Sequence, residues 1–485
     1  MTARSTDGRP STVRSPRLPI LALIAVVALV IGFVATAYSL PIDDFWLTLA
    51  SGARLLGGAP IDRALDFTWT PMLDGALNPQ WGAQLIFAAP GSVGGALAIN
   101  AALIAIGLLT TALRTARRAT GGAVAIAMLL VVAAIAPHLL ARAQSFSIAL
   151  MPVALLLLAR YRDRPWLPVA YGLVMVVWAN THGAFVIGQI AALAVLVDAM
   201  VDRTNRVVLA STVVVAFVAP LANPSGLGLL VYAYGQPGLE LIRQISVEWQ
   251  PAWPWIPLTW LFWAQAGLFV AFRISRRGGA PLDELLLGAG LLILAATSLR
   301  QIPWFCLATA PILAADVSTF AGGRLGERLG SMPGWFNGHK AKTTLLSAAA
   351  LAVLVQPIRP IAPQAIARVT PDAPVALVDR LAGELDGSRG ARVLNEQVWG
   401  GYLAYALGDR IETAMDGRIE IRDRSTWASY FSLMRGEGNA VEELAANDVE
   451  WALLAPDRET LIRHLTDSGW TTVDRDAQGA LLSAP

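Results

Sequence analysis

The sequence predicts an all-α polytopic membrane bundle of about eleven transmembrane helices, followed by a small soluble α/β domain. Three observations support this fold class. The chain of 485 residues is 55% hydrophobic and only 15% charged, and its mean hydropathy of +0.54 is high for a soluble globular protein. Apolar runs long enough to cross a bilayer recur as far as residue 358. Beyond residue 365 the apolar runs shorten to the length of strands.

The transmembrane helices are predicted from apolar runs of about 17 to 25 residues. They lie at 18–40, 93–113, 121–139, 144–159, 166–179, 184–201, 207–222, 254–272, 283–298, 302–318 and 343–358. The runs at 144–159 and 166–179 are short and lie beside Pro152 and Pro165, so a re-entrant segment there is the alternative. A re-entrant segment would reverse the orientation of every later segment. The run at 18–40 is longer than a typical signal-peptide core, which favours an uncleaved first helix over a cleaved leader.

The distribution of basic residues predicts the orientation, because Lys and Arg accumulate in the cytoplasmic loops of membrane proteins. With the N-terminus inside, the inner loops hold 19 Lys and Arg and the outer loops up to residue 342 hold 5. We therefore expect a disordered cytoplasmic tail at 1–17 and a transmembrane domain at 18–360 with outer loops at 41–92 and 223–253. Topology accounts for the basic residues and the net charge is only +2, so no nucleic-acid partner is indicated.

The C-terminal part is predicted to be an extracytoplasmic α/β domain at 365–485, because an odd number of spans places it outside. Short strand-like stretches are ARVLNE, RIETAM, VEWALLAP and TTVDRD, and they alternate with the helical patterns VALVDRLAGEL and RETLIRHLTDSG. The single cysteine, Cys306, lies inside a span and is interpreted as a small buried apolar residue.

Polar motifs gather at the predicted outer ends of the spans. They are DDFW (43–46), ARAQ (141–144), NTHG (180–183), NPSG (223–226), SVEWQ (246–250) and SLRQIP (298–303). A carboxylate could accept the proton of an attacking hydroxyl, which makes Asp43 and Asp44 the catalytic candidates. The candidates for phosphate binding are Arg142, His182 and Arg300, those for sugar hydroxyls are Gln144, Asn180, Asn223 and Gln301, and Glu248 completes the substrate-binding set.

Each of these motifs also has a purely structural interpretation. Asp43 and Asp44 could be a solvated end of the first span, and His182 could cap a helix beside Gly183. Single arginines at helix ends commonly reach to lipid headgroups, and Glu248 could be an ordinary loop carboxylate. The coincidence of all six motifs on one face of the membrane favours a shared outer cavity, since arginines without a function should favour the inner face.

The order of these motifs resembles a family of bacterial polytopic proteins in the GT-C superfamily of membrane glycosyltransferases. The stretch DDFWLTLASGARLLGGAPIDRALDFTWT resembles the first outer loop of that family. ARAQSFSIAL, WANTHGAFVIG, NPSG, VEW and SLRQIPWF are similar to its successive motifs, and VLNEQVWGGYLAYAL and AMDGRIEI resemble its outer C-terminal domain. The resemblance covers nearly the whole chain.

The resemblance implies an enzyme of the bacterial inner membrane that transfers a hexosyl or pentosyl group from a polyprenyl-phosphate-linked sugar to an outer-face acceptor. It places the catalytic base at Asp44, with Asp43 as its neighbour. The chain departs from the family at Leu47 and Thr48, where members often have Trp and His, and at NPQWGAQ, where they often have an acidic residue. No cofactor is therefore assigned, and a divalent metal is left open. The expected partners are the lipid-linked sugar donor and membrane lipids.

Two alternative functions remain. The chain could be an envelope polysaccharide polymerase or ligase, or a non-catalytic membrane protein with the GT-C fold. A transporter is disfavoured, because transporters carry polar residues and broken helices at the membrane midplane, whereas the polar motifs here gather at one face. The sugar, the acceptor and the oligomeric state are not indicated by the sequence.

Overall fold

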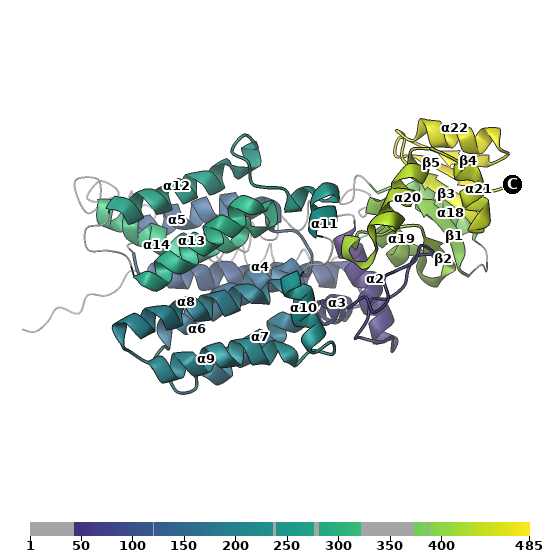
Figure 1. Cartoon of the computed structure of the whole chain (residues 1–485). Helices are drawn as coiled ribbons and strands as arrows, with labels where there is room; N and C mark the ends of the chain where they lie inside the picture. Colours follow the sequence, from purple (N-terminus) through teal and green to yellow (C-terminus); the bar gives the residue numbers. More distant parts are fainter. Residues whose placement is uncertain are drawn as a thin grey trace, which may run out of the picture.

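The computed structural model describes residues 43–119, 121–235, 239–275, 281–321, 373–385, 387 and 389–485. The predicted tail at 1–17 and the predicted spans at 18–40 and 343–358 lie outside these residues. Figure 1 shows a bundle of long helices with a C-terminal α/β domain at one end. Two helices of the first predicted outer loop, α2 (Asp44–Leu56) and α3 (Trp81–Ala88), lie between these two parts.

Helices are present at all nine predicted spans that fall within the described residues. They are α4 (Val93–Ala116), α5 (Gly121–Ile135), α6 (Gln144–Arg160), α7 (Leu167–Thr181), α8 (Val186–Asp202), α9 (Arg206–Val218), α12 (Trp260–Ser275), α13 (Leu282–Thr297) and α14 (Ile302–Ala321). Two shorter helices, α10 (Leu227–Gly235) and α11 (Leu239–Ile245), follow α9. Helix α12 begins later than predicted because Pro254 and Pro257 cannot donate the backbone hydrogen bonds of a helix interior.

Four helical segments of the described chain are long and apolar enough to cross a membrane by length and composition. They are Val93–Ala116, Gly183–Asp202, Pro257–Ser275 and Leu299–Thr319. Shorter apolar helices lie at Gly122–His138, Gln144–Arg160, Leu167–Thr181 and Arg206–Leu221. The predicted count of about eleven spans is therefore not established. Large apolar side chains such as Leu173, Val207 and Ile293 are exposed on the outer surfaces of the bundle, as expected for helices that face lipid.

Small residues bring neighbouring helices close together in the bundle. A Cβ added at Gly107 of α4 would lie 2.1 Å from the carbonyl oxygen of Ile148 in α6, so only glycine allows this approach. Gly52 has the same role between α2 and α3, where an added Cβ would lie 2.1 Å from the carbonyl oxygen of Gln84.

The end of the bundle away from the C-terminal domain carries paired charges. Arg162 forms ion pairs with Asp198 and Asp283, and Arg273 forms ion pairs with Glu284 and Asp316. These pairs join helices α8, α12, α13 and α14 and satisfy acidic groups that would otherwise be buried without a partner.

The C-terminal domain contains a five-stranded mixed sheet with the order β2-β1-β3-β5-β4. The strands are β1 (Ala391–Asn395), β2 (Ile411–Thr413), β3 (Val449–Leu454), β4 (Thr471–Arg475) and β5 (Ala480–Ser483). Strand β1 pairs in parallel with β2 and β3, whereas β5 pairs antiparallel with β3 and β4. The helices are α18 (Val375–Glu384), α19 (Gly400–Leu407), α20 (Arg424–Met434), α21 (Ala440–Ala446) and α22 (Glu459–Asp467).

The sequence predicts four of these strands and helices α18 and α22, and all of them are present. It misses β5, because a run of four residues of which three are buried shows no alternation of apolar and polar residues.

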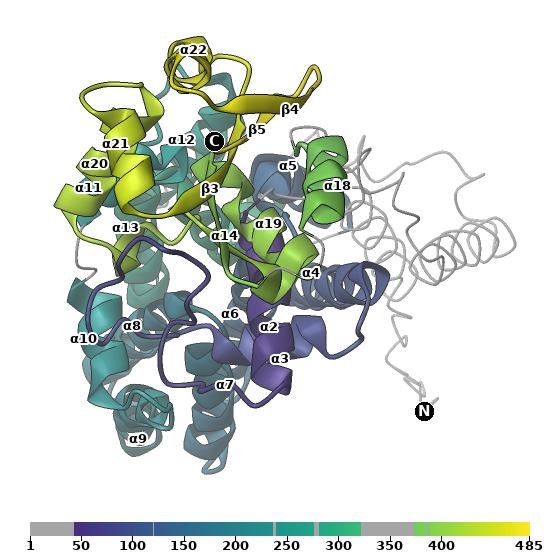
Figure 2. The same cartoon turned by 90° about the vertical axis from the view of Figure 1, so that its right-hand side faces the viewer.

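The C-terminal domain is joined to the first predicted outer loop by side-chain packing and by strand-like pairing. The ring of Trp46 in α2 packs edge-on against Tyr402 of α19, with 5.3 Å between ring centroids. The backbone N–H of Thr413 in β2 donates to the carbonyl of Phe67, and Trp69 donates back to Thr413, so the loop extends the edge of the sheet. Figures 1 and 2 both show α19 beside α2. Residues that are more than 340 positions apart therefore form one structural unit.

Candidate active site

A cavity of about 750 Å³ lies where the bundle meets the C-terminal domain. Helix α2, the start of α8, helix α10, two short 3₁₀ helices (Val247–Trp249 and Leu299–Gln301) and the segment 417–421 of the C-terminal domain all contribute to its wall. Eight of the ten predicted site residues line it, namely Asp43, Asp44, Arg142, Gln144, His182, Glu248, Arg300 and Gln301. The cavity thus collects side chains from segments that are far apart in the sequence.

The two adjacent aspartates have different surroundings. Asp44 begins α2, where the helix dipole favours a negative charge, and its side chain is 47% exposed to the cavity. Its carboxylate Oδ2 lies 3.4 Å from Nη1 of Arg142. Asp43 instead turns toward the C-terminal domain, where its Oδ1 accepts a hydrogen bond of 2.9 Å from the backbone N–H of Gly401. Burial, Asp416 and Asp44 raise the pKa of Asp43 well above its usual value.

Arg142, Glu248 and Arg300 form an ion-pair cluster next to Asp44. Nη1 of Arg142 lies 2.7 Å from Oε1 of Glu248, and Nη1 of Arg300 lies 3.7 Å from Oε2 of the same carboxylate. Burial opposes the charged form of Glu248, but Arg142 and Arg300 outweigh it and lower the pKa of this carboxyl. Glu248 is therefore ionised at neutral pH.

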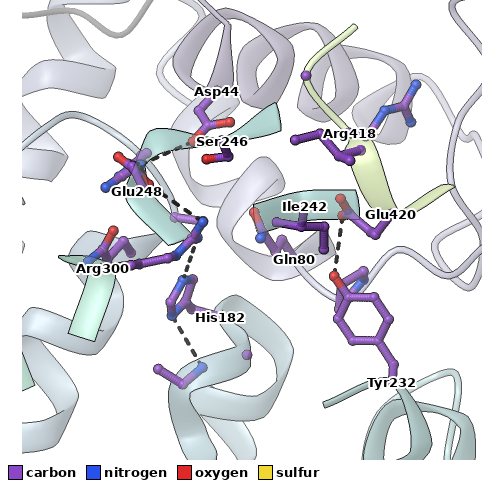
Figure 3. A pocket seen from close by; sticks show the side chains of 18 of the residues that line it. Asp44, Gln80, His182, Tyr232, Ile242, Ser246, Glu248, Arg300, Arg418 and Glu420 are labelled. Atoms are coloured by element: carbon purple, nitrogen blue, oxygen red, sulfur yellow. Dashed lines mark hydrogen bonds and ion pairs between the residues drawn. The ribbon is translucent and has the colours of Figure 1, made fainter. Parts of the chain in front are cut away.

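His182 lies beside Arg300 at the junction between α7 and α8 (Figure 3). Burial lowers the pKa of its ring well below the usual value, with further contributions from Arg300 and Arg142, so the ring is neutral. Nδ1 is 2.7 Å from the hydroxyl of Ser147, which itself accepts from the indole N–H of Trp178, and Nδ1 also accepts from the backbone N–H of Ala184. This hydrogen-bond network assigns the ring proton to Nε2.

Nε2 of His182 lies 3.5 Å from Nη2 of Arg300. With the proton on Nε2, both groups are hydrogen-bond donors, and two donors that face one another need an acceptor between or beside them. The arrangement is suited to an anion such as a phosphate oxygen.

Arg142 and Gln144 keep unused polar atoms next to the cavity. Nε and Nη2 of Arg142, and both side-chain amide atoms of Gln144, are buried and have no hydrogen-bond partner among the described residues. Nearly all buried polar groups in proteins are hydrogen-bonded, so unsatisfied groups that line a cavity point to a ligand.

Asn180 and Asn223 are the two predicted site residues that do not line the cavity. Oδ1 of Asn180 accepts from Nδ2 of Asn223 at 2.9 Å and from the indole N–H of Trp81 at 2.8 Å. Nδ2 of Asn180 donates to the carbonyls of Val176 and Ala222. Their amides hold the ends of α7 and α9 beside α3.

The opposite wall contains residues that the sequence analysis did not select. Tyr232 donates to Oε1 of Glu420 at 3.3 Å, and Arg418 lies beside Glu420 (Figure 3). Arg418 is itself held by Asp416, whose carboxylate is fully buried. The motif AMDGRIEI contains Asp416, Arg418 and Glu420, but nothing in the sequence shows that this motif folds over the start of α2.

A metal site is not evident in the described part of the chain, where no group of three or more His, Cys, Asp and Glu side chains is placed to hold a metal ion. Asp44 and Glu248 both contact Nη1 of Arg142, so this arginine lies between the two carboxylates.

Comparison with known proteins gives matches at the level of structure. No family model and no curated sequence matches the chain. The oligosaccharyltransferase of Archaeoglobus fulgidus, solved with a tethered acceptor peptide that contains an NVT sequon, matches with a TM-score of 0.58 and 14% identity over 91% of this chain and 69% of that chain. ArnT from Cupriavidus metallidurans, solved bound to undecaprenyl phosphate, matches with a TM-score of 0.57 and 15% identity over 96% of this chain and 97% of that chain.

The apo form of ArnT matches over similar lengths, 97% of this chain and 98% of that chain, with a TM-score of 0.53 and 16% identity. At these identities the similarity concerns the fold, and both neighbours are GT-C glycosyltransferases. The ArnT matches include both the bundle and the C-terminal domain, because they cover 96% and 97% of this chain. The chain therefore has the fold of the GT-C membrane glycosyltransferases, as the order of its sequence motifs predicts.

Proposed function

We propose that the protein is a membrane glycosyltransferase that moves a sugar from a polyprenyl-phosphate-linked donor to a hydroxyl-bearing acceptor at the outer face of the bacterial inner membrane. The observation that carries the proposal is the convergence of Asp44, Arg142, Arg300 and His182 in one cavity of about 750 Å³. The volume is within the range of small-molecule sites. That ArnT was solved with undecaprenyl phosphate supports a lipid phosphate as part of the donor.

The geometry supports a simple division of roles. Asp44 is more exposed than Glu248, the other carboxylate that contacts Arg142, and it takes the proton from the acceptor hydroxyl. The hydroxyl oxygen then forms a bond to the anomeric carbon as the bond between that carbon and the phosphate oxygen breaks. Arg142, Arg300 and the Nε2 proton of His182 stabilise the negative charge that develops on the departing phosphate.

The test is mass spectrometry of envelope glycans and lipid-linked sugars in a strain that lacks the protein. We expect one sugar to disappear from an outer-face glycan and its lipid-linked form to accumulate, and the wild-type gene to reverse both changes. Shorter polymers or unattached chains with normal sugar composition would indicate a polymerase or ligase. Unchanged glycans and unchanged lipid-linked sugars would reject a transferase.

A further inference from the structure

Glu248 lines the cavity, but its carboxylate carries the same sign of charge as a phosphate and would repel it. Its carboxylate lies 2.7 Å from Arg142 and 3.7 Å from Arg300, the two cations that the proposed function assigns to the donor. An anionic donor therefore meets a site in which the cations already have a partner.

We infer that Glu248 is a resident counter-ion, which the monoanionic phosphodiester of a lipid-monophosphate sugar replaces charge for charge when the donor binds. The inference rests on the proposed function and deepens it, since it assigns Glu248 a role other than direct substrate binding and selects one class of donor. Lipid-pyrophosphate sugars are the class of donor that this exchange disfavours.

The charges of the cluster support a one-for-one exchange. Asp44 and Glu248 carry one formal negative charge each, Arg142 and Arg300 carry one positive charge each, and the ring of His182 is neutral. These groups are therefore balanced with the carboxylate of Glu248 in place. A phosphodiester carries one negative charge and keeps that balance, whereas a pyrophosphodiester carries two and leaves one charge without a counter-charge among these groups.

The local structure allows the side chain of Glu248 to leave while the cations stay. Its side chain is 34% exposed, and its backbone is held independently, because its carbonyl accepts a hydrogen bond of 3.1 Å from the hydroxyl of Ser298. The guanidinium of Arg300 lies 5.5 Å from the ring centroid of Trp249 and keeps this cation–π contact without the carboxylate. A swing of one side chain is therefore enough to open the site.

Arg142 has more hydrogen-bond donors than its present partners use. Only its Nη1 contacts Glu248 and Asp44, while Nε and Nη2 have no partner among the described residues, although 96% of the residue's surface is covered. A guanidinium binds phosphate best through two parallel N–H donors, so a phosphodiester with two free oxygens can satisfy donors that one carboxylate does not.

The variant that tests the exchange is Glu248→Gln. Glutamine keeps an acceptor oxygen for Arg142 and removes the competing charge. The matched control is Glu240→Gln, which removes one negative charge from the same outer segment, where Glu240 is 81% exposed and lies 3.7 Å from Arg424. Binding is measured by calorimetry on the purified full-length protein in nanodiscs, with methyl farnesyl phosphodiester and methyl farnesyl pyrophosphodiester as probes.

We expect the wild-type protein to prefer the phosphodiester. Glu248→Gln should bind it about tenfold to a hundredfold more tightly, because the donor phosphate no longer competes with a carboxylate for the two arginines. Glu240→Gln should bind like the wild type. The counter-ion role is overturned if Glu248→Gln keeps the wild-type melting temperature and binds the phosphodiester equally well or more weakly. If glutamine impairs folding, Glu248→Ala replaces it, and the same result with that variant overturns the role.

Two further outcomes separate this inference from the function on which it rests. A wild-type preference for the pyrophosphodiester overturns the choice of donor class while the glycosyltransferase proposal stands. If neither the wild type nor Glu248→Gln binds either probe, the inference and the lipid-phosphate donor fail together.

Discussion

Asp44 is the side chain on which the proposed chemistry depends. We expect Asp44→Asn to lower sugar transfer about 100- to 10,000-fold, because an amide cannot accept the proton of the attacking hydroxyl. Folding should be retained, since the carboxylate is half exposed and its contact with Arg142, at 3.4 Å, is long, while Arg142 keeps Glu248. The measurement is transfer of radiolabelled sugar in membranes that contain equal amounts of each variant.

The matched control for this experiment is Asp74→Asn, an exposed aspartate of the same outer loop that does not line the cavity. It should transfer sugar at the wild-type rate. A wild-type rate for Asp44→Asn would remove Asp44 from the mechanism and would leave the cavity as a binding site.

At the residue scale, the sequence predicts which end of each span is polar but not which polar groups meet. The apolar runs place Arg142, His182 and Arg300 at one face, and the structure brings them together. Asn180 and Asn223 share that pattern, yet their amides bond to each other, because only the crossing of α7 and α9 decides where they point. Tyr232 and Glu420 are missed because their pairing depends on a contact over 188 residues of sequence.

At the scale of elements, the packing of α2 against the C-terminal domain positions the aspartates. A Cβ added at Gly417 would lie 1.5 Å from Oδ2 of Asp43, and one added at Gly401 would lie 2.4 Å from the backbone oxygen of Asp43. These two glycines allow the domain to approach the start of α2 closely enough for the Gly401 hydrogen bond.

We therefore expect Gly417→Ala to destabilise the protein by about 1–3 kcal/mol, because the new methyl group forces Asp43 and the domain apart. Gly383→Ala is the control, since Gly383 is exposed in α18 and an added Cβ meets no atom within 4 Å. It should be neutral or slightly stabilising, because alanine favours a helix. Thermal unfolding followed by tryptophan fluorescence measures both. Equal melting temperatures for the two variants would show that the close approach has no energetic importance.

The elements themselves differ in how far the sequence predicts them. Long apolar runs give the bundle helices, because burial in lipid needs continuous hydrophobicity whatever the tertiary contacts are. Helix α2 of the predicted outer loop is not predicted, since its apolar side chains are covered by α3 of the same loop and by α19, which is distant in the sequence. Strand β5 is missed because its four residues, of which three are buried, show no alternation of apolar and polar side chains.

At the scale of the whole molecule, the bundle and the C-terminal domain together indicate which end of the protein faces the cytoplasm. Asp44 and residues 417–421 line the same cavity, so the C-terminal domain and the candidate base lie at one end of the bundle. Figure 1 shows helix α2, which begins at Asp44, beside that domain. The paired arginines Arg162 and Arg273 lie at the other end. Since basic residues accumulate in cytoplasmic loops, that end is the expected cytoplasmic one, and the domain is expected outside.

A fluorescent protein that matures only in the cytoplasm tests this orientation when it is fused after Pro485. We expect this fusion to be dark, because the charge asymmetry of 19 to 5 places the C-terminal domain on the outer side. A fusion that ends after Arg164, between α6 and α7, should be bright, and it controls for expression and insertion. If the Pro485 fusion is bright and the Arg164 fusion dark, the bundle is inverted and the donor must be sought in the cytoplasm. If both are bright, the number of membrane crossings between residues 164 and 485 is even, and the domain cannot be on the outer side.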